Sequence, residues 1–190
     1  MTRTHASSWT VSMPTALETC IRVAAAPAGD AGPWPLSRAL AQLAPLGVRA
    51  EERFRALGSG RGRPLIHSQE ARWHGLPVEL EAISCREPGT LDEVALALPS
   101  HTEMLAADDV DESAFWELVD TFAAAVDARH GAIVDGEAIL LEPPAGQVGW
   151  QRRFSRHFGL LVPAEVARCW PPAAAPYRRL PRSDLLVVLR

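Results

Sequence analysis

The chain has 190 residues, a net charge of −4 and 47% hydrophobic residues, which suffices for one folded domain with its own core. It has no run of about 18 apolar residues, and no apolar segment near Met1 resembles a secretory signal, so we expect neither a transmembrane helix nor export. All nineteen basic residues are arginines, which excludes lysine chemistry such as a Schiff base or a P-loop.

The cysteines indicate the cellular compartment of the protein, and the absence of lysine indicates the base composition of its genome. Cys20, Cys85 and Cys169 are widely spaced and odd in number, which argues against a disulfide framework and favours the reducing cytoplasm. The codon bias of a GC-rich bacterial genome explains the missing lysines most simply, with selection against a lysine-directed modification as the alternative. We find no cofactor motif and expect no bound cofactor.

The first third of the chain predicts two strands followed by two helices. Short runs with alternating or β-branched residues predict strands at 8–12 and 20–26. Residues 35–46 have leucines at helical spacing and a proline in the first turn, which predicts a helix that ends at Gly47. Weaker helical spacing at 50–57 predicts a second short helix, with inward side chains at Phe54 and Leu57.

The middle of the chain contains the clearest strand signals. A short strand at 64–67 and a turn at 73–77 precede residues 78–84, in which apolar side chains alternate with Glu79 and Glu81. Residues 94–98 alternate large and small apolar side chains. We expect these two runs to pair as antiparallel strands linked through Pro88-Gly89, followed by an acidic loop at 100–110.

The stretch from Asp111 to Ile139 is the one around which we expect the chain to be organised. Its apolar residues recur at spacings of three and four, which predicts an amphipathic helix over 111–130 with Asp111 near its start and Gly131 as its left-handed cap. A strand at 132–134, a turn at Asp135-Gly136 and a second strand should follow. The stripe consists of Phe115, Leu118, Val119, Phe122, Ala125 and Val126.

The last third should add two helices, an apolar run, a linker and a final strand. Trp150, Phe154 and Phe158 share one helical face, the apolar run 160–162 precedes a short helix at 163–170, and residues 185–189 predict a strand with both faces covered. Residues 171–176 resemble a linker. The sequence predicts an α+β fold with a mostly antiparallel sheet packed against the 111–130 helix and shorter helices, in one domain over 1–190, with 100–110 as the alternative boundary.

Charge is distributed unevenly along the chain. Residues 1–78 carry nine arginines and five carboxylates, residues 79–142 two and sixteen, and residues 143–190 eight and two. Either the basic ends fold against the acidic middle and the fields cancel, or strands 79–98 and helix 111–130 present an acidic face that attracts a basic protein. In the second case we expect the partner-binding residues to be Glu79, Glu81, Glu117, Asp120 and Asp127.

Other residues suggest chemistry only weakly. His67 and His74 are seven apart, a poor spacing for a metal pair, and Cys85 next to Arg86 lacks a histidine at motif distance. Glu79 and Glu81 share a strand face about 7 Å apart, as paired catalytic carboxylates do, but no other part of a glycosidase signature is present. Residues 58–64 could bind an anion, and Arg152, Arg153 and Arg156 could bind phosphate or RNA, but both segments are more simply solvated.

The missing catalytic signatures and the acidic middle favour a non-enzymatic, cytoplasmic protein-binding domain. A finer form of this hypothesis is an immunity or antitoxin-type inhibitor of a basic toxin. The alternatives are a nucleic-acid-associated protein and an enzyme of unrecognised type that uses Glu79 and Glu81, or His67 and His74. We expect the partner to be another protein, with a homodimer as a further option, and expect neither a membrane nor nucleic acid.

Overall fold

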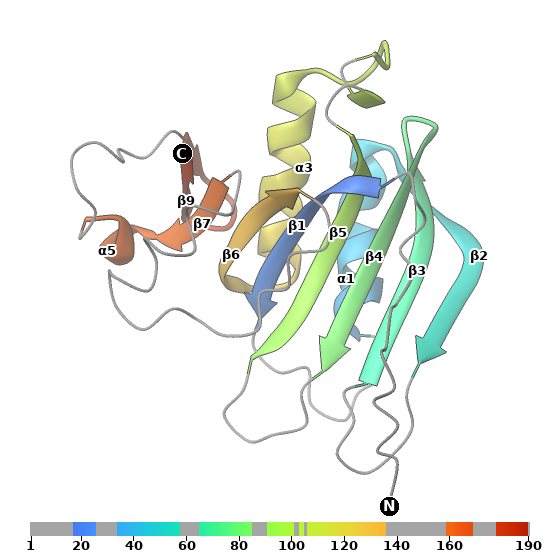
Figure 1. Ribbon diagram of the computed structural model, residues 1–190, viewed down its shortest axis with the longest axis horizontal. Helices are drawn as coiled ribbons and strands as arrows, with labels where there is room; N and C mark the ends of the chain where they lie inside the picture. Colours follow the sequence, from blue (N-terminus) through green and yellow to red (C-terminus); the bar gives the residue numbers. More distant parts are fainter. Residues whose placement is uncertain are drawn as a thin grey trace, which may run out of the picture.

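The computed structural model describes residues 17–25, 34–57, 65–84, 91–100, 103–104, 106–135, 159–168 and 178–189 (Figure 1). Within them, nine strands form one sheet in the order β2-β3-β4-β5-β1-β6-β7-β9-β8, and every neighbouring pair is antiparallel. The predicted α+β class with a mostly antiparallel sheet is therefore confirmed. The strands are β1 (Leu17–Ala25), β2 (Val48–Leu57), β3 (Leu65–Trp73), β4 (Leu76–Ser84), β5 (Asp92–Pro99), β6 (Ala128–Asp135), β7 (Gly159–Pro163), β8 (Arg178–Leu180) and β9 (Leu185–Leu189).

Different helices cover the two faces of the sheet. The helices α1 (Trp34–Leu43) and α3 (Glu112–Ala125) lie next to each other on one face, called here the helix face (Figure 1). The short helix α5 (Ala164–Ala167) packs against β7 and β9, where Ala167 joins an apolar cluster on the opposite face, called here the second face. None of the described helices has the length and apolar character needed to cross a membrane.

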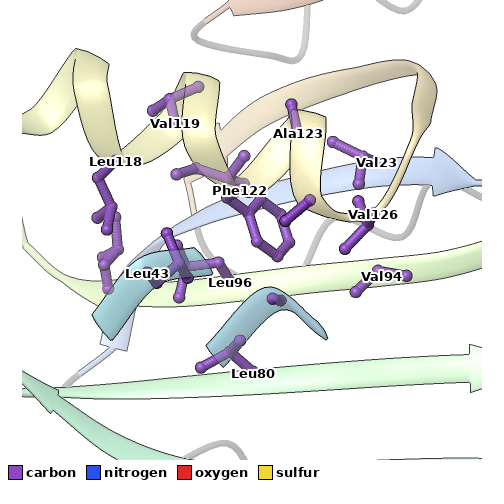
Figure 2. Packing of buried hydrophobic residues seen from close by; sticks show 14 of the residues in the cluster. Val23, Leu43, Leu80, Val94, Leu96, Leu118, Val119, Phe122, Ala123 and Val126 are labelled. Atoms are coloured by element: carbon purple, nitrogen blue, oxygen red, sulfur yellow. The ribbon is translucent and has the colours of Figure 1, made fainter. Parts of the chain in front are cut away.

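The main core lies between the helix face and the two long helices. Strand alternation sends every second side chain to this face, so Val23, Leu80 and Leu96 meet the apolar stripe of α3. Figure 2 shows Phe122 pointing from α3 toward β5, with Leu43 of α1 on the same side of the sheet. Phe122 is fully buried, as the predicted stripe requires.

Several predicted elements are confirmed. The strand at 20–26 is β1, the helix at 35–46 is α1 followed by a 3₁₀ turn at Ala44–Leu46, and the two alternating runs pair as β4 and β5. The strand at 185–189 is β9, and the apolar run at 160–162, for which no strand was predicted, lies in β7. The predictions for 8–12, 58–64, Pro88-Gly89, 136–158 and 171–176 lie outside the described residues.

The predicted short helix at 50–57 is wrong, because these residues form the edge strand β2. β2 pairs with β3, but the register shifts between Ala50 and Phe54. Such an irregularity breaks the period of two and leaves a spacing that imitates a helix. The orientations of Phe54 and Leu57 lie outside the described side chains.

The predicted end of the long helix is also wrong. Asp111 caps α3 by accepting from the backbone N–H of Ala114 at 2.7 Å, but the helix ends at Ala125 and not at Gly131. Asp127, with φ of 54°, takes the left-handed conformation in the turn, a conformation that aspartate tolerates better than most residues. Arg129 and His130, expected in the last helical turn, and Gly131 lie in β6 instead.

Candidate functional site

The five carboxylates predicted to bind a partner do not form one surface. Glu79 and Glu81 alternate with the core residues of β4 and therefore lie on the second face, away from α3. Glu79 is half-buried and Glu81 is 9% exposed. The side chains of Glu79 and Glu81 and those of α3 therefore lie on opposite sides of the sheet.

Two of the predicted residues contact the turn between β8 and β9. Asp120 is 4% exposed, and its carboxylate accepts hydrogen bonds from the backbone N–H groups of Arg182 and Ser183 at 3.0 and 2.9 Å. Glu117 is exposed and pairs with the Arg182 guanidinium at 2.7 Å, and the same guanidinium donates to Thr121 Oγ1 at 2.7 Å. Positive charge from the C-terminal segment therefore covers this part of α3.

The fifth predicted residue, Asp127, lies in the turn after α3. Its carboxylate is exposed and pairs with Arg129 at 3.3 Å, two residues away. An ion pair between two side chains that are each more than half exposed contributes little to stability, about 0–1 kcal/mol. Asp127 thus remains accessible, but it lies at the opposite end of α3 from the segment between β5 and α3.

A buried ionic cluster occupies the middle of the second face. Arg22 on β1 pairs with Glu93 on β5, and the side chains of both are less than a tenth exposed. Cys20 lies two residues from Arg22 on the same face, and Glu81 of β4 is opposite Ala95 of β5, which is opposite Arg22. The cluster therefore joins three adjacent strands.

The environment of this cluster disfavours nucleophilic chemistry. Burial raises the pKa of the Cys20 thiol to about 11, against the opposing effect of Arg22. Burial also raises the pKa of Glu81 and of Glu93 above ordinary carboxyl values, and attraction to Arg22 offsets only part of this. Burial alone would lower the pKa of Arg22, but Cys20, Glu93 and Glu81 together raise it. A thiol with a raised pKa is protonated at neutral pH, so Cys20 is not an activated nucleophile.

The histidine pair is not brought together. His67 is buried on β3 at the position opposite Ala82, whereas His74 lies exposed in the turn between β3 and β4. Seven residues of extended chain separate them by about 20 Å. Within the described ranges, no group of three or more histidine, cysteine or acidic side chains could hold a metal ion. Cys85 and the arginines Arg152, Arg153 and Arg156 lie outside those ranges.

Exposed carboxylates gather where the chain leaves β5 and enters α3, at the upper end of α3 in Figure 1. Residues 103–112 contain five carboxylates and no arginine. We call this group the acidic end; all its members are exposed, and they are Glu103, Asp108, Asp109, Asp111 and Glu112.

The acidic end borders apolar side chains that the core does not fully cover. Phe115 continues the buried stripe of α3 by one turn but is only half-buried. Ala107 and Ala114 also pack on the core while remaining partly exposed. Partly exposed apolar side chains near charged ones in the chain are a common composition of protein-binding surfaces.

The members of the acidic end differ in their partners among the described residues. Arg178 approaches Glu112 to 3.7 Å, whereas the side chains of Asp108 and Asp109 form no hydrogen bond or ion pair with any other described residue. Asp111 is used in part to cap α3, and Glu103 accepts from the Ser100 backbone N–H at 3.1 Å.

Sequence reasoning missed Arg22, Glu93 and Arg182. A single arginine inside the apolar run of β1 is a signal for a buried partner, and Glu93 at the start of the β5 run is another. Arg182 carries no local signal, because its partners lie 61 to 65 residues away. Comparison of the chain with protein-family models, curated proteins and solved structures gives no match.

Proposed function

We propose that this chain is a non-enzymatic protein-binding domain whose acidic end binds a basic protein. The carrying observation is the half-buried Phe115 beside five exposed carboxylates, of which Asp108 and Asp109 have no partner among the described residues. We place the binding surface at the acidic end and not on the expected acidic face over Glu79, Glu81, Glu117 and Asp120. Glu79 is half-buried, Glu81 and Asp120 are buried, and Glu117 is paired with Arg182.

Charge and apolar area contribute to binding in different ways. Clustered negative charge accelerates association with a positively charged partner, and the effect falls as salt screens it. The N-terminal end of α3 carries a partial positive charge, which stabilises Asp111 and Glu112 without neutralising Asp108 and Asp109. Phe115 supplies the apolar contact area that charge alone does not provide.

The test captures partners from a lysate of the source cells with the tagged full-length chain and with two double variants. Asp108→Asn/Asp109→Asn removes two of the five negative charges of the acidic end, and Glu51→Gln/Glu52→Gln removes an equal number from the edge strand β2. We expect a basic protein that the parent and the β2 variant retain, that the acidic-end variant loses, and that high salt releases. Retention of the same proteins by all three would contradict the proposal, as would the absence of a basic protein.

A finer version of the proposal makes the chain an inhibitor of a basic toxin. It rests on the same acidic end and on the same charge complementarity. A captured basic protein that stops growth when expressed alone, and does not when co-expressed with this chain, would support it. If the captured protein is not toxic, the proposed binding function stands and the proposed role as a toxin inhibitor is contradicted.

A further inference from the structure

Two neighbouring pairs of residues at the N-terminus of α3, the first of which begins at the N-cap, have the same composition, an acidic residue followed four positions later by an aromatic one. The first comprises Asp111 and Phe115, and the second comprises Glu112 and Trp116. Residues four apart lie on one side of a helix, on successive turns. The backbone N–H of Phe115 donates to the Asp111 carbonyl at 3.0 Å, which places these two on successive turns.

The second pair holds an arginine from the C-terminal segment. The Trp116 indole N–H donates to Glu112 at 3.2 Å, and the Arg178 guanidinium lies over the Trp116 ring, 5.5 Å from its centroid. The same guanidinium approaches Glu112 to 3.7 Å. A carboxylate and an aromatic ring therefore bind one guanidinium together, the ring through its negative face and the carboxylate through its charge.

The first pair has no such occupant within the described part of the chain. Phe115 contacts Trp116 edge to face, with centroids 5.1 Å apart, and its ring is half-buried. Asp111 is exposed, and only its Oδ1 atom is used to cap α3, at 2.7 Å from the Ala114 nitrogen. No described arginine lies over Phe115 or pairs with Asp111.

We propose that Asp111 and Phe115 bind an arginine side chain of the partner, in the way that Glu112 and Trp116 bind Arg178. This inference rests on the proposed function and narrows it to a partner that presents arginine in preference to lysine. A guanidinium is planar and weakly hydrated, so it stacks on a ring and pairs with a carboxylate at the same time, whereas an ammonium retains its water. Asp108 and Asp109 attract either cation.

The test uses two fluorescent peptides of equal length and net charge, one with arginine and one with lysine at every basic position. Binding to the folded full-length chain is followed by fluorescence anisotropy. We expect the arginine peptide to bind about two- to fivefold more tightly, the range that one exposed cation–π contact supplies. Phe115→Leu should abolish that preference and leave the lysine peptide unchanged, while Phe115→Tyr should keep it.

The outcomes separate this inference from the proposed function. Equal binding of both peptides, or a preference that survives in Phe115→Leu, would overturn the arginine site. The binding function would then stand if Asp108→Asn/Asp109→Asn still weakened both peptides. If neither peptide binds at low salt, both the arginine site and the acidic end as a binding surface are overturned. Circular dichroism of each variant verifies that it is folded.

Discussion

Ser183 and Asp120 are joined by two hydrogen bonds across 63 residues of chain. The backbone N–H and the hydroxyl of Ser183 both donate to Asp120 Oδ1, each at 2.9 Å. Because Asp120 is 4% exposed, these donors and the Arg182 N–H replace the water that the carboxylate loses on folding. The contact fixes the β8–β9 turn against α3.

Replacement of Asp120 should therefore destabilise the protein. Asp120→Ala leaves two backbone N–H groups and a hydroxyl without their acceptor, so we expect a loss of about 3 kcal/mol in the free energy of unfolding, measured by urea denaturation. The matched variant Glu117→Ala removes only the half-exposed pair with Arg182 and should cost about 1 kcal/mol or less. Similar losses for the two variants would show that Asp120 is no more important than a surface charge.

The pair between Arg22 and Glu93 makes a second prediction about stability. Glu93→Ala leaves the Arg22 guanidinium buried without its partner, which should cost about 3–5 kcal/mol. Arg22→Met/Glu93→Met removes both charges and should have a stability close to or above that of the parent protein. If the double variant is as unstable as Glu93→Ala, Glu93 contributes to stability through packing and not through its charge.

The same cluster predicts how stability depends on pH. Burial raises the pKa of Glu81 in the folded protein above its ordinary value of 4.5, so the folded state binds the proton more tightly than the unfolded chain does. The stabilisation that this proton provides is complete below pH 4.5 and is lost as the pH rises through the folded-state pKa. Glu81→Gln should therefore have the higher Tm at neutral pH and a flatter profile.

Thermal melts between about pH 4 and pH 8 test this pH dependence. Glu51→Gln, which removes a carboxylate that is 39% exposed on β2, serves as the control variant. A Glu81→Gln profile that falls as steeply as that of the parent would assign the pH dependence to other groups.

Gly131 provides a prediction about backbone packing. A Cβ atom at this position would lie 2.5 Å from the Arg22 carbonyl oxygen and 2.8 Å from a Val23 methyl group. Because the first of these is backbone, β1 and β6 must separate locally, and Gly131→Ala should cost about 1–3 kcal/mol by urea denaturation. Gly75→Ala meets no atom within 4 Å and suffers only the strain of its left-handed φ, so it should cost less.

Local periodicity explains which parts of the fold could be predicted from the sequence. The alternation in β4 and β5, the stripe of α3 and the cap at Asp111 are each encoded by residues close together in the chain. The register shift in β2 could not be predicted in this way, because a shifted strand imitates helical spacing. The end of α3 was misplaced because Gly131 resembles a helix cap but is required by the close approach of Val23.

The ion pairs could not be predicted in the same way. Arg22 meets Glu93 across 71 residues, and Arg182 meets α3 across more than 60, so their partners are set by topology. Charge counting along the chain identified the acidic middle but not which side of the sheet each carboxylate occupies. For that reason Glu81 and Asp120 were expected on a surface although both are buried.

Phe122 gives the last prediction, which tests the stripe from which the position of Phe115 was inferred. Phe122 is fully buried between α3 and the helix face, so Phe122→Ala should cost about 3–5 kcal/mol in the free energy of unfolding. Phe115→Ala removes the same atoms from a half-buried ring and should cost less than half as much. The difference matters for function, because a ring that contributes little to folding is free to contribute to binding. If Phe115→Ala is as destabilising as Phe122→Ala, Phe115 belongs to the core, and the acidic end has no apolar centre.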